Sequence, residues 1–160
     1  SKIRPNQLFA LSLTYPVIEA DSEEAKNIIS VVEKKLLNAY GLKTLAKGEE
    51  NYVEVYEGDG KKRDSSYHQG ITWPWLLGLY YNALKNILKK TKKKDAKKEL
   101  ETKLEKFIEK TSKTFQKEIS HNGCIGSISE LYDSRKPYLP KGTIAQAWSV
   151  AEVFRIILNK

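Results

Sequence analysis

The sequence predicts an all-α fold, and three observations support that prediction. Apolar residues recur at helical spacing over long stretches of the chain. Prolines and glycines stand where helices are expected to begin and end. Strand-like alternation is confined to the segment YVEVY at residues 52–56, which we interpret as one short strand within a loop. The 160 residues suit one domain or a large part of one.

The first two predicted helices lie in the N-terminal quarter of the chain. A short apolar helix is expected over residues 6–13, directly after a proline. A longer helix is expected over residues 22–39. Asp21 and Glu24 have the spacing of a capping box at its start. Gly41 suits a left-handed cap just beyond its end.

Three further helices follow. The third is predicted over residues 74–89; it begins with a proline and is apolar almost all round at its start, which is typical of a central helix. The fourth is predicted over residues 95–119, with a stripe of leucine, isoleucine and phenylalanine. The fifth is predicted over residues 143–158, where Thr143 and Gln146 have capping-box spacing.

Two connections between these helices are long. Residues 41–73 separate the second helix from the third, and residues 120–142 separate the fourth from the fifth. Within the first connection, EGDGKKRD at residues 57–64 predicts a turn. If consecutive helices pack antiparallel, both long connections lie at the same end of the helical bundle. Long loops in compact domains usually carry function, so we expect the site there.

The rarest polar and aromatic side chains of the chain gather in these connections. RDSSYHQGITWPW, residues 63–75, holds one of two histidines and two of three tryptophans. Aromatic platforms beside hydrogen-bonding groups suit a sugar, which has apolar C–H faces and many hydroxyls. Trp148 is expected to approach from the fifth helix. The other candidates on this face are Tyr67, His68, Gln69, Trp73, Trp75, Glu130, Tyr132, Asp133 and Arg135.

Each candidate also has a purely structural interpretation. Glu130 could be a surface glutamate paired with Arg135. The tryptophans could be core residues, and Gln146 could serve only as a helix cap. No spacing typical of a metal site, a serine triad or a phosphate loop is present, so neither a metal nor a cofactor is predicted. Spacing favours neither histidine as a partner for Cys124, which is the single cysteine.

The charge pattern bears on partners. The net charge is +8, and eight lysines lie in residues 85–98. A basic run of this kind could bind nucleic acid, but no arginine cluster or interleaved aromatic accompanies it, and a solvated helix end explains it as well. We therefore expect no nucleic-acid partner. No apolar run approaches the roughly 20 residues that a membrane helix needs. Without a signal pattern or a disulfide pair, a cytoplasmic location is expected.

Four segments in order resemble a known family. They are RPNQLFALSL, AYGLKTL, YEGDGKKRDSSYHQGITWPWLLG and GSISELYDSRKPYLPKGTIAQAWSVAEVFR. Together they resemble the C-terminal part of glycogen debranching enzymes, the amylo-α-1,6-glucosidase domain, over nearly the whole chain. The resemblance implies an α/α toroid with its active site at one end. It also implies hydrolysis of α-1,6-glucosidic branch points in glycogen or limit dextrin by an inverting acid–base mechanism.

The resemblance also implies roles for residues. The glutamate of the ISEL-type motif falls on Glu130, which becomes the expected general base. The WPW segment and the AQAWS segment imply a substrate-binding wall. Its expected members are Tyr67, His68, Gln69, Trp73, Trp75, Gln146 and Trp148.

The resemblance is partial in one respect. Five predicted helices are fewer than the twelve of an (α/α)6 toroid, and the aspartate motif that carries the family's general acid is absent. Residues 1–160 are therefore expected to form the C-terminal part of a toroid in a longer enzyme and to be inactive alone. The expected partners are an α-glucan, the remaining N-terminal part of the toroid and, through self-association, a second copy of the chain. Two alternatives stay open: a non-catalytic carbohydrate-binding helical module, and a basic helical protein that binds nucleic acid.

Overall fold

The computed structural model describes residues 2–159, and helices account for 53% of the structure. Six α-helices and two 3-10 helices occur in the described part. In chain order they are η1 (Pro5–Leu8), α1 (Phe9–Ser12), α2 (Glu23–Lys35), α3 (Gly60–Ser66), η2 (Pro74–Leu76), α4 (Leu77–Lys90), α5 (Lys94–His121) and α6 (Ala147–Ile157).

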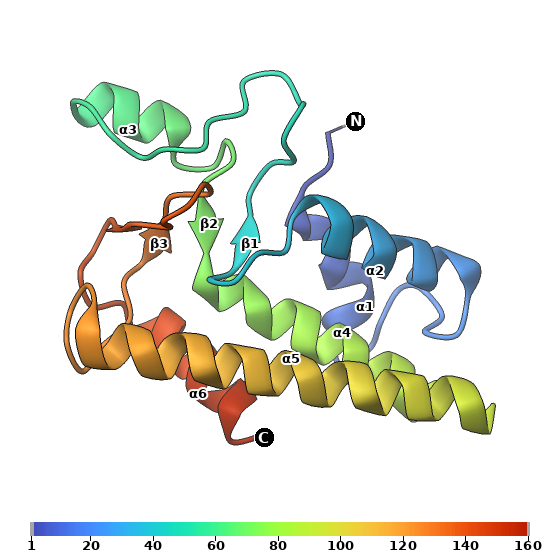
Figure 1. The fold of residues 1–160 in the computed structure, drawn as a ribbon. Helices are drawn as coiled ribbons and strands as arrows, with labels where there is room; N and C mark the ends of the chain where they lie inside the picture. Colours follow the sequence, from blue (N-terminus) through green and yellow to red (C-terminus); the bar gives the residue numbers. More distant parts are fainter. Residues whose placement is uncertain (1, 160) are drawn as a thin grey trace.

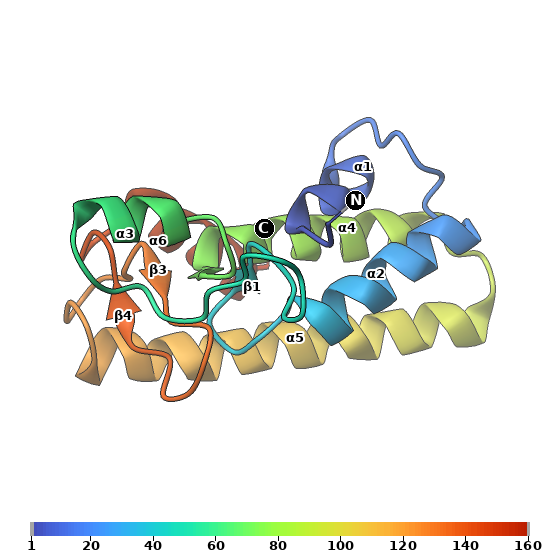
Figure 2. The same cartoon turned by 90° about the horizontal axis from the view of Figure 1, so that it is seen from above.

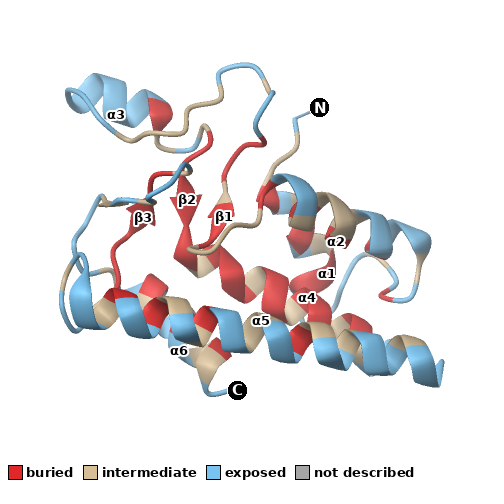
Figure 3. Cartoon of the chain, in the orientation of Figure 1, coloured by how far each residue is buried: buried red, intermediate tan, exposed pale blue. Residues whose placement is uncertain are grey.

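The longest helix, α5, runs along one side of the molecule (Figures 1 and 2). The α4 helix comes directly before α5 in the chain. A turn of three residues connects the two helices, which run in opposite directions. The α1 helix packs on α4, and α6 packs on both α4 and α5. The buried side chains therefore centre on α4, as its nearly all-round apolar start predicts (Figure 3).

A small sheet corrects the prediction of an all-α fold. Its strands are β1 (Leu42–Lys43), β2 (Thr72–Trp73), β3 (Leu131–Tyr132) and β4 (Pro140–Lys141). They pair antiparallel in the order β1-β2-β3-β4. Each strand has two residues, too few to produce an alternating pattern in a sequence. The fold is mostly helical, but it is not all-α.

The pairing of β2 with β3 joins the two long connections. Thr72 comes from the first and stands opposite Tyr132 from the second. Thr72 is also linked to the second connection through its hydroxyl, which lies 2.6 Å from that of Ser134. Both connections therefore meet at one end of the helices, beside the C-terminal half of α5, as the connectivity predicts (Figure 2).

The structure differs from the prediction in two places: at the ends of the α2 helix and in residues 57–64. The α2 helix is capped by Ser22, whose hydroxyl accepts from the Ala25 N–H at 3.1 Å, and not by Asp21. It ends at Lys35, because Leu37 forms a bridge with Leu42 instead of another helical turn. The short α3 helix replaces the predicted turn in residues 57–64.

Two further local predictions are wrong. Residues 52–56 are not a strand, although their backbone is tied to both connections: the Val53 N–H donates to Gln69 and the Glu54 carbonyl accepts from Ser134. The α6 helix begins at Ala147, with Gln146 as its cap, and not at residue 143.

Candidate functional site

A hollow of about 850 Å³ lies where the two long connections meet. The first connection contributes one wall through α3 and the segment before it, and the second contributes the other. Most of the lining side chains are polar or charged. The lining residues are Tyr56, Glu57, Gly58, Arg63, Asp64, Tyr67, Glu130, Lys141, Gly142 and Thr143.

Glu130 is the most constrained side chain of this hollow. It directly precedes β3 and is 8% exposed. One carboxylate oxygen, Oε1, accepts from the Tyr67 hydroxyl at 2.5 Å and from Gln146 Nε2 at 3.3 Å. The other, Oε2, accepts from the Thr143 N–H at 3.1 Å. All three donors are neutral groups.

No cation pairs with Glu130 among the described residues, so the predicted alternative of an ion pair with Arg135 does not form. An ionised carboxylate can accept at about four positions. The three donors leave a position for one further donor, such as a water molecule. A buried carboxylate that is oriented but not neutralised is suited to accept a proton from such a water.

Tyr67 is placed by α3. The carboxylate of Asp59 caps that helix by accepting from the Lys62 N–H at 2.8 Å, and Tyr67 follows the last helical residue. Burial raises the pKa of the Tyr67 hydroxyl, and the hydrogen bond to Glu130 and the charge of that carboxylate raise it further. The hydroxyl therefore stays protonated and remains a donor to Glu130 over the physiological pH range.

An aromatic ladder leads away from Tyr67. The Tyr67 ring meets Trp73 edge-on at 4.7 Å between centroids, and His68 stacks on Trp73 at 5.2 Å. Trp73 meets Trp148 at 5.9 Å, and Trp148 stacks on Trp75 at 5.3 Å. Trp73 is 2% exposed and Trp148 is 45% exposed, so the outer end of the ladder offers a free aromatic face.

Arg4 secures the segment that carries His68. Its guanidinium donates to the carbonyl of His68 at 2.7 Å, to Gln69 Oε1 at 2.9 Å and to the carbonyl of Thr44 at 3.0 Å. Partial burial lowers the pKa of His68, and the Arg4 charge lowers it further, while the Glu130 charge opposes both. Near neutral pH the ring is therefore uncharged.

The second connection is held in place by contacts with α5 and with the first connection. Glu118, near the end of α5, is 2% exposed and accepts from the Tyr132 hydroxyl at 3.0 Å. The Tyr40 ring stacks on Tyr132 at 4.6 Å. Asp133 accepts from the Tyr56 N–H at 2.9 Å and so links the two connections again. These contacts fix β3 and, with it, the position of Glu130.

The structure brings some of the sequence-predicted site residues together and separates others. Tyr67 and Glu130 line the hollow, and Gln146 reaches Glu130 from the start of α6. Trp73 is packed in the core, Gln69 turns toward Arg4, and the remaining three stand in the ladder beside the hollow: His68, Trp75 and Trp148.

Sequence reasoning missed Thr143, whose backbone N–H holds Glu130, and the charged lining residues Arg63 and Asp64. A backbone donor has no signal in a sequence. Arg63 and Asp64 belong to the α3 helix, which the sequence analysis did not predict. Among residues 2–159, no group of three His, Cys, Asp or Glu side chains is arranged to hold a metal ion. No helix in the same range is long and apolar enough to cross a membrane.

The motifs that surround this hollow can be compared with known families. A family model described as amylo-alpha-1,6-glucosidase matches residues 1–155. The chain belongs to this family. The match confirms the resemblance seen in the four sequence segments, and it extends across the lysine-rich stretch that those segments leave out. Membership in the amylo-alpha-1,6-glucosidase family relates the chain to glycoside hydrolases and to the glycogen debranching enzymes, whose substrates are α-glucans.

Proposed function

We propose that this chain is the C-terminal part of a longer cytoplasmic glycogen debranching enzyme and supplies the general base of its α-1,6-glucosidase centre. The observation that carries the proposal is the Glu130 carboxylate. It is buried, held by three neutral donors and placed at the wall of a hollow in a member of the amylo-alpha-1,6-glucosidase family.

The chemistry follows from the free acceptor position on Glu130. A water molecule that donates to this carboxylate loses its proton to it as the water attacks the anomeric carbon of the branch glucose. A carboxylic acid on the opposite face protonates the leaving oxygen. The two carboxyls of an inverting glycosidase stand roughly 6.5–9.5 Å apart to make room for the water. We assign the acid to a segment of the longer enzyme upstream of this chain.

The aromatic ladder is the proposed substrate wall. Trp148 and Trp75 would stack on glucosyl units of the α-glucan, while His68 and Tyr67 would lie nearer the scissile bond. Gln146 and Gln69 would act through hydrogen bonds, Gln146 by orienting Glu130 and Gln69 by fixing the loop through Arg4. Trp73 would support the ladder from the core.

The remaining part of an α/α toroid is the proposed neighbour of α6. Beyond Trp148, the outward face of α6 is apolar and exposed at Ala151, Phe154 and Leu158, which recur at helical spacing. Exposed apolar patches of this kind mark interaction sites. In the longer enzyme further helices would cover this face; in the isolated chain it would favour self-association.

Glucose release from a branched limit dextrin tests the proposal. The longer enzyme should release glucose with inversion at the anomeric carbon, and unbranched maltodextrin should yield none. The isolated 160-residue chain should bind the dextrin and release no glucose. Turnover by the isolated chain would contradict the assignment of the acid and would direct attention to Asp64 and Glu57, the other carboxylates of the hollow.

A further inference from the structure

The lysine-rich tip, defined as residues 85–98 at the end of α4 and the start of α5, carries most of the excess charge of the molecule. These residues hold eight lysines and one aspartate, so seven of the eight net positive charges lie there. Lys85 contacts the Tyr81 hydroxyl at 3.2 Å. The other seven lysines are exposed, and none has an acidic partner within 4.0 Å among residues 2–159.

Helix stability does not account for this charge. Lys89 and Lys90 end α4, where the helix dipole favours cations. Lys93, Lys94 and Lys97 lie at the start of α5, where the dipole disfavours them, and no side chain caps that helix. Further along α5, lysines alternate with glutamates and form ion pairs, such as Lys103 with Glu33 at 2.9 Å. Seven lysines without an acidic partner among residues 2–159 are therefore concentrated in the tip, whereas unpaired lysines such as Lys110 and Lys117 are spaced widely along the rest of α5.

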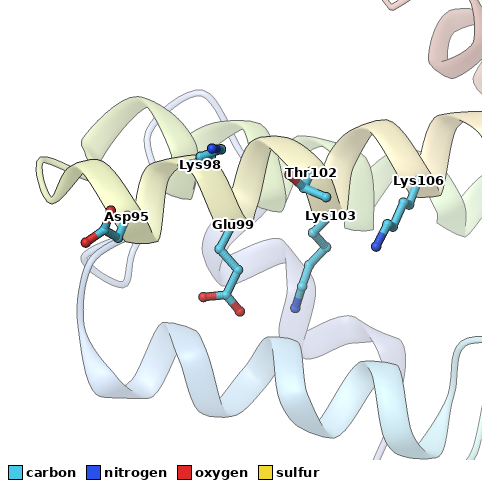
Figure 4. A pocket seen from close by; sticks show the side chains of 6 residues that line it. All are labelled: Asp95, Lys98, Glu99, Thr102, Lys103 and Lys106. Carbon is cyan, nitrogen blue, oxygen red and sulfur yellow. The ribbon is translucent and has the colours of Figure 1, made fainter.

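A groove adjoins the tip between α5 and α2. Figure 4 shows Glu99, Lys103 and Lys106 projecting from α5 toward α2, around a hollow of about 600 Å³. A second hollow of about 660 Å³ shares Glu99 and Lys103 with the first and continues it toward α4.

The second hollow has an apolar floor and a charged rim. Ile29, Ile87 and Leu100 form its floor, from α2, α4 and α5 respectively. Lys92 and Lys93 of the tip stand on its rim. Asp21 and Glu99 also belong to the rim, so the groove itself is mixed in charge, whereas the tip beside it is basic.

We propose that the tip and this groove form a docking surface for an acidic segment of a partner protein that carries an apolar anchor side chain. The carboxylates of the segment would meet the unpaired lysines, and the anchor would enter the groove, in the manner of an amphipathic segment bound in an apolar cleft. The apolar floor favours a protein over a nucleic acid, which has no aliphatic side chain to place there. The tip also has no arginine or aromatic residue for contacts with bases.

The geometry also favours a protein over a membrane. No large apolar side chain of residues 85–98 is exposed, so nothing on the tip would insert into lipid. The surface lies at the N-terminal end of α5, whereas β3, which directly follows Glu130, lies beside the C-terminal half of that helix (Figure 1). A helix of this length spans about 40 Å. A docked partner would therefore leave the hollow open, and the proposal does not depend on the proposed function.

Fluorescence anisotropy with the 160-residue chain tests the proposal. The probe is a fluorescein-labelled peptide with leucine at helical spacing and glutamate elsewhere; a second probe has serine in place of leucine. The first should bind, more weakly as salt is added, and the second should bind at least about fivefold more weakly. Lys92→Gln with Lys93→Gln should weaken binding of the first probe about fivefold. Lys110→Gln with Lys117→Gln removes the same charge elsewhere on α5 and should change binding less than about twofold.

A groove variant separates docking from simple charge attraction. Ala96→Gln places a larger, uncharged side chain on the wall of the groove at a helical position that tolerates it. It should weaken binding of the leucine probe and leave binding of the serine probe nearly unchanged. Helicity measured by circular dichroism is the folding control. Equal binding of the two probes, no binding of either, or tighter binding of duplex DNA or phosphatidylserine vesicles than of the leucine probe would each overturn the proposal.

Discussion

The Tyr67 hydroxyl donates a 2.5 Å hydrogen bond to Glu130, and this bond joins the two long connections through residues that are 63 positions apart in the chain. One end of the bond is set by the capped α3 helix and the other by the pairing of β3 in the sheet. The bond therefore reports whether the two connections have assembled the hollow. It also fixes the orientation of the carboxylate that we propose as the general base.

Removal of this hydroxyl should affect both stability and activity. Tyr67→Phe leaves a mostly buried carboxylate with one donor fewer, so the free energy of unfolding should fall by about 1–2 kcal/mol. In the longer enzyme kcat should fall about tenfold because Glu130 is less well oriented, while KM should change little. Tyr15→Phe removes a hydroxyl from a side chain that is 88% exposed and should alter neither quantity. Unchanged kcat in Tyr67→Phe would mean that the bond has no part in catalysis.

Gly142 tests the packing around Glu130 without removing any functional group. Its φ is +69°, and a Cβ there would collide with Oε2 of Glu130. Gly142→Ala should therefore displace the carboxylate and lower glucose release by the longer enzyme at least about tenfold. Gly126→Ala is the matched control: its φ is +86°, and a Cβ there would meet no atom within 4 Å.

Both glycine variants should lose about 1 kcal/mol of stability from the left-handed backbone, since each forces an alanine into it. Only Gly142→Ala should lose activity beyond that shared effect. Equal activities of the two variants would show that the carboxylate position is not limiting.

The pKa of His68 should lie below its ordinary value. Its folded pKa lies below the ordinary value of 6.5, chiefly through partial burial and then through Arg4. Between the folded pKa and 6.5 the unfolded chain binds more protons than the folded chain. The stability contributed by uncharged His68 is therefore complete above pH 6.5 and is lost as the pH falls toward the folded pKa.

Proton NMR of the imidazole ring measures this directly, with His121→Gln used to assign the signal. The midpoint for His68 should lie below 6.5, and Arg4→Gln should raise it. A midpoint at or above 6.5 would show that neither burial nor Arg4 controls the ring.

The long helices could be predicted from the helical spacing of apolar residues. The third and fourth predicted helices correspond to α4 and α5 because their apolar stripes are long and face the core. The α3 helix has no such stripe: GKKRDSS is polar, and its formation depends on the Asp59 cap and on tertiary contacts. The strands were missed because two residues cannot define a period.

Part of the candidate site was also predictable from the sequence, and part was not. The motif around Glu130 and the aromatic residues near Tyr67 were identifiable because unusual side chains stand in long connections. The donors to Glu130 depend on how β3, β4 and α6 meet, and a backbone N–H such as that of Thr143 leaves no mark on the sequence. The burial of Trp73 likewise follows from its place in β2 and not from its residue type.

The central claim is that Glu130 is the general base. Its most direct test is glucose release from a branched limit dextrin by the longer enzyme with Glu130→Gln, compared with Glu101→Gln, a change of the same kind on the exposed side of α5. Folding of both variants is checked by circular dichroism. We expect Glu130→Gln to lose about a hundredfold or more of the activity, as removal of a general base does, and Glu101→Gln to lose none. Near-normal activity of Glu130→Gln would contradict the claim, and this part of the enzyme would then serve only as a scaffold or a binding wall.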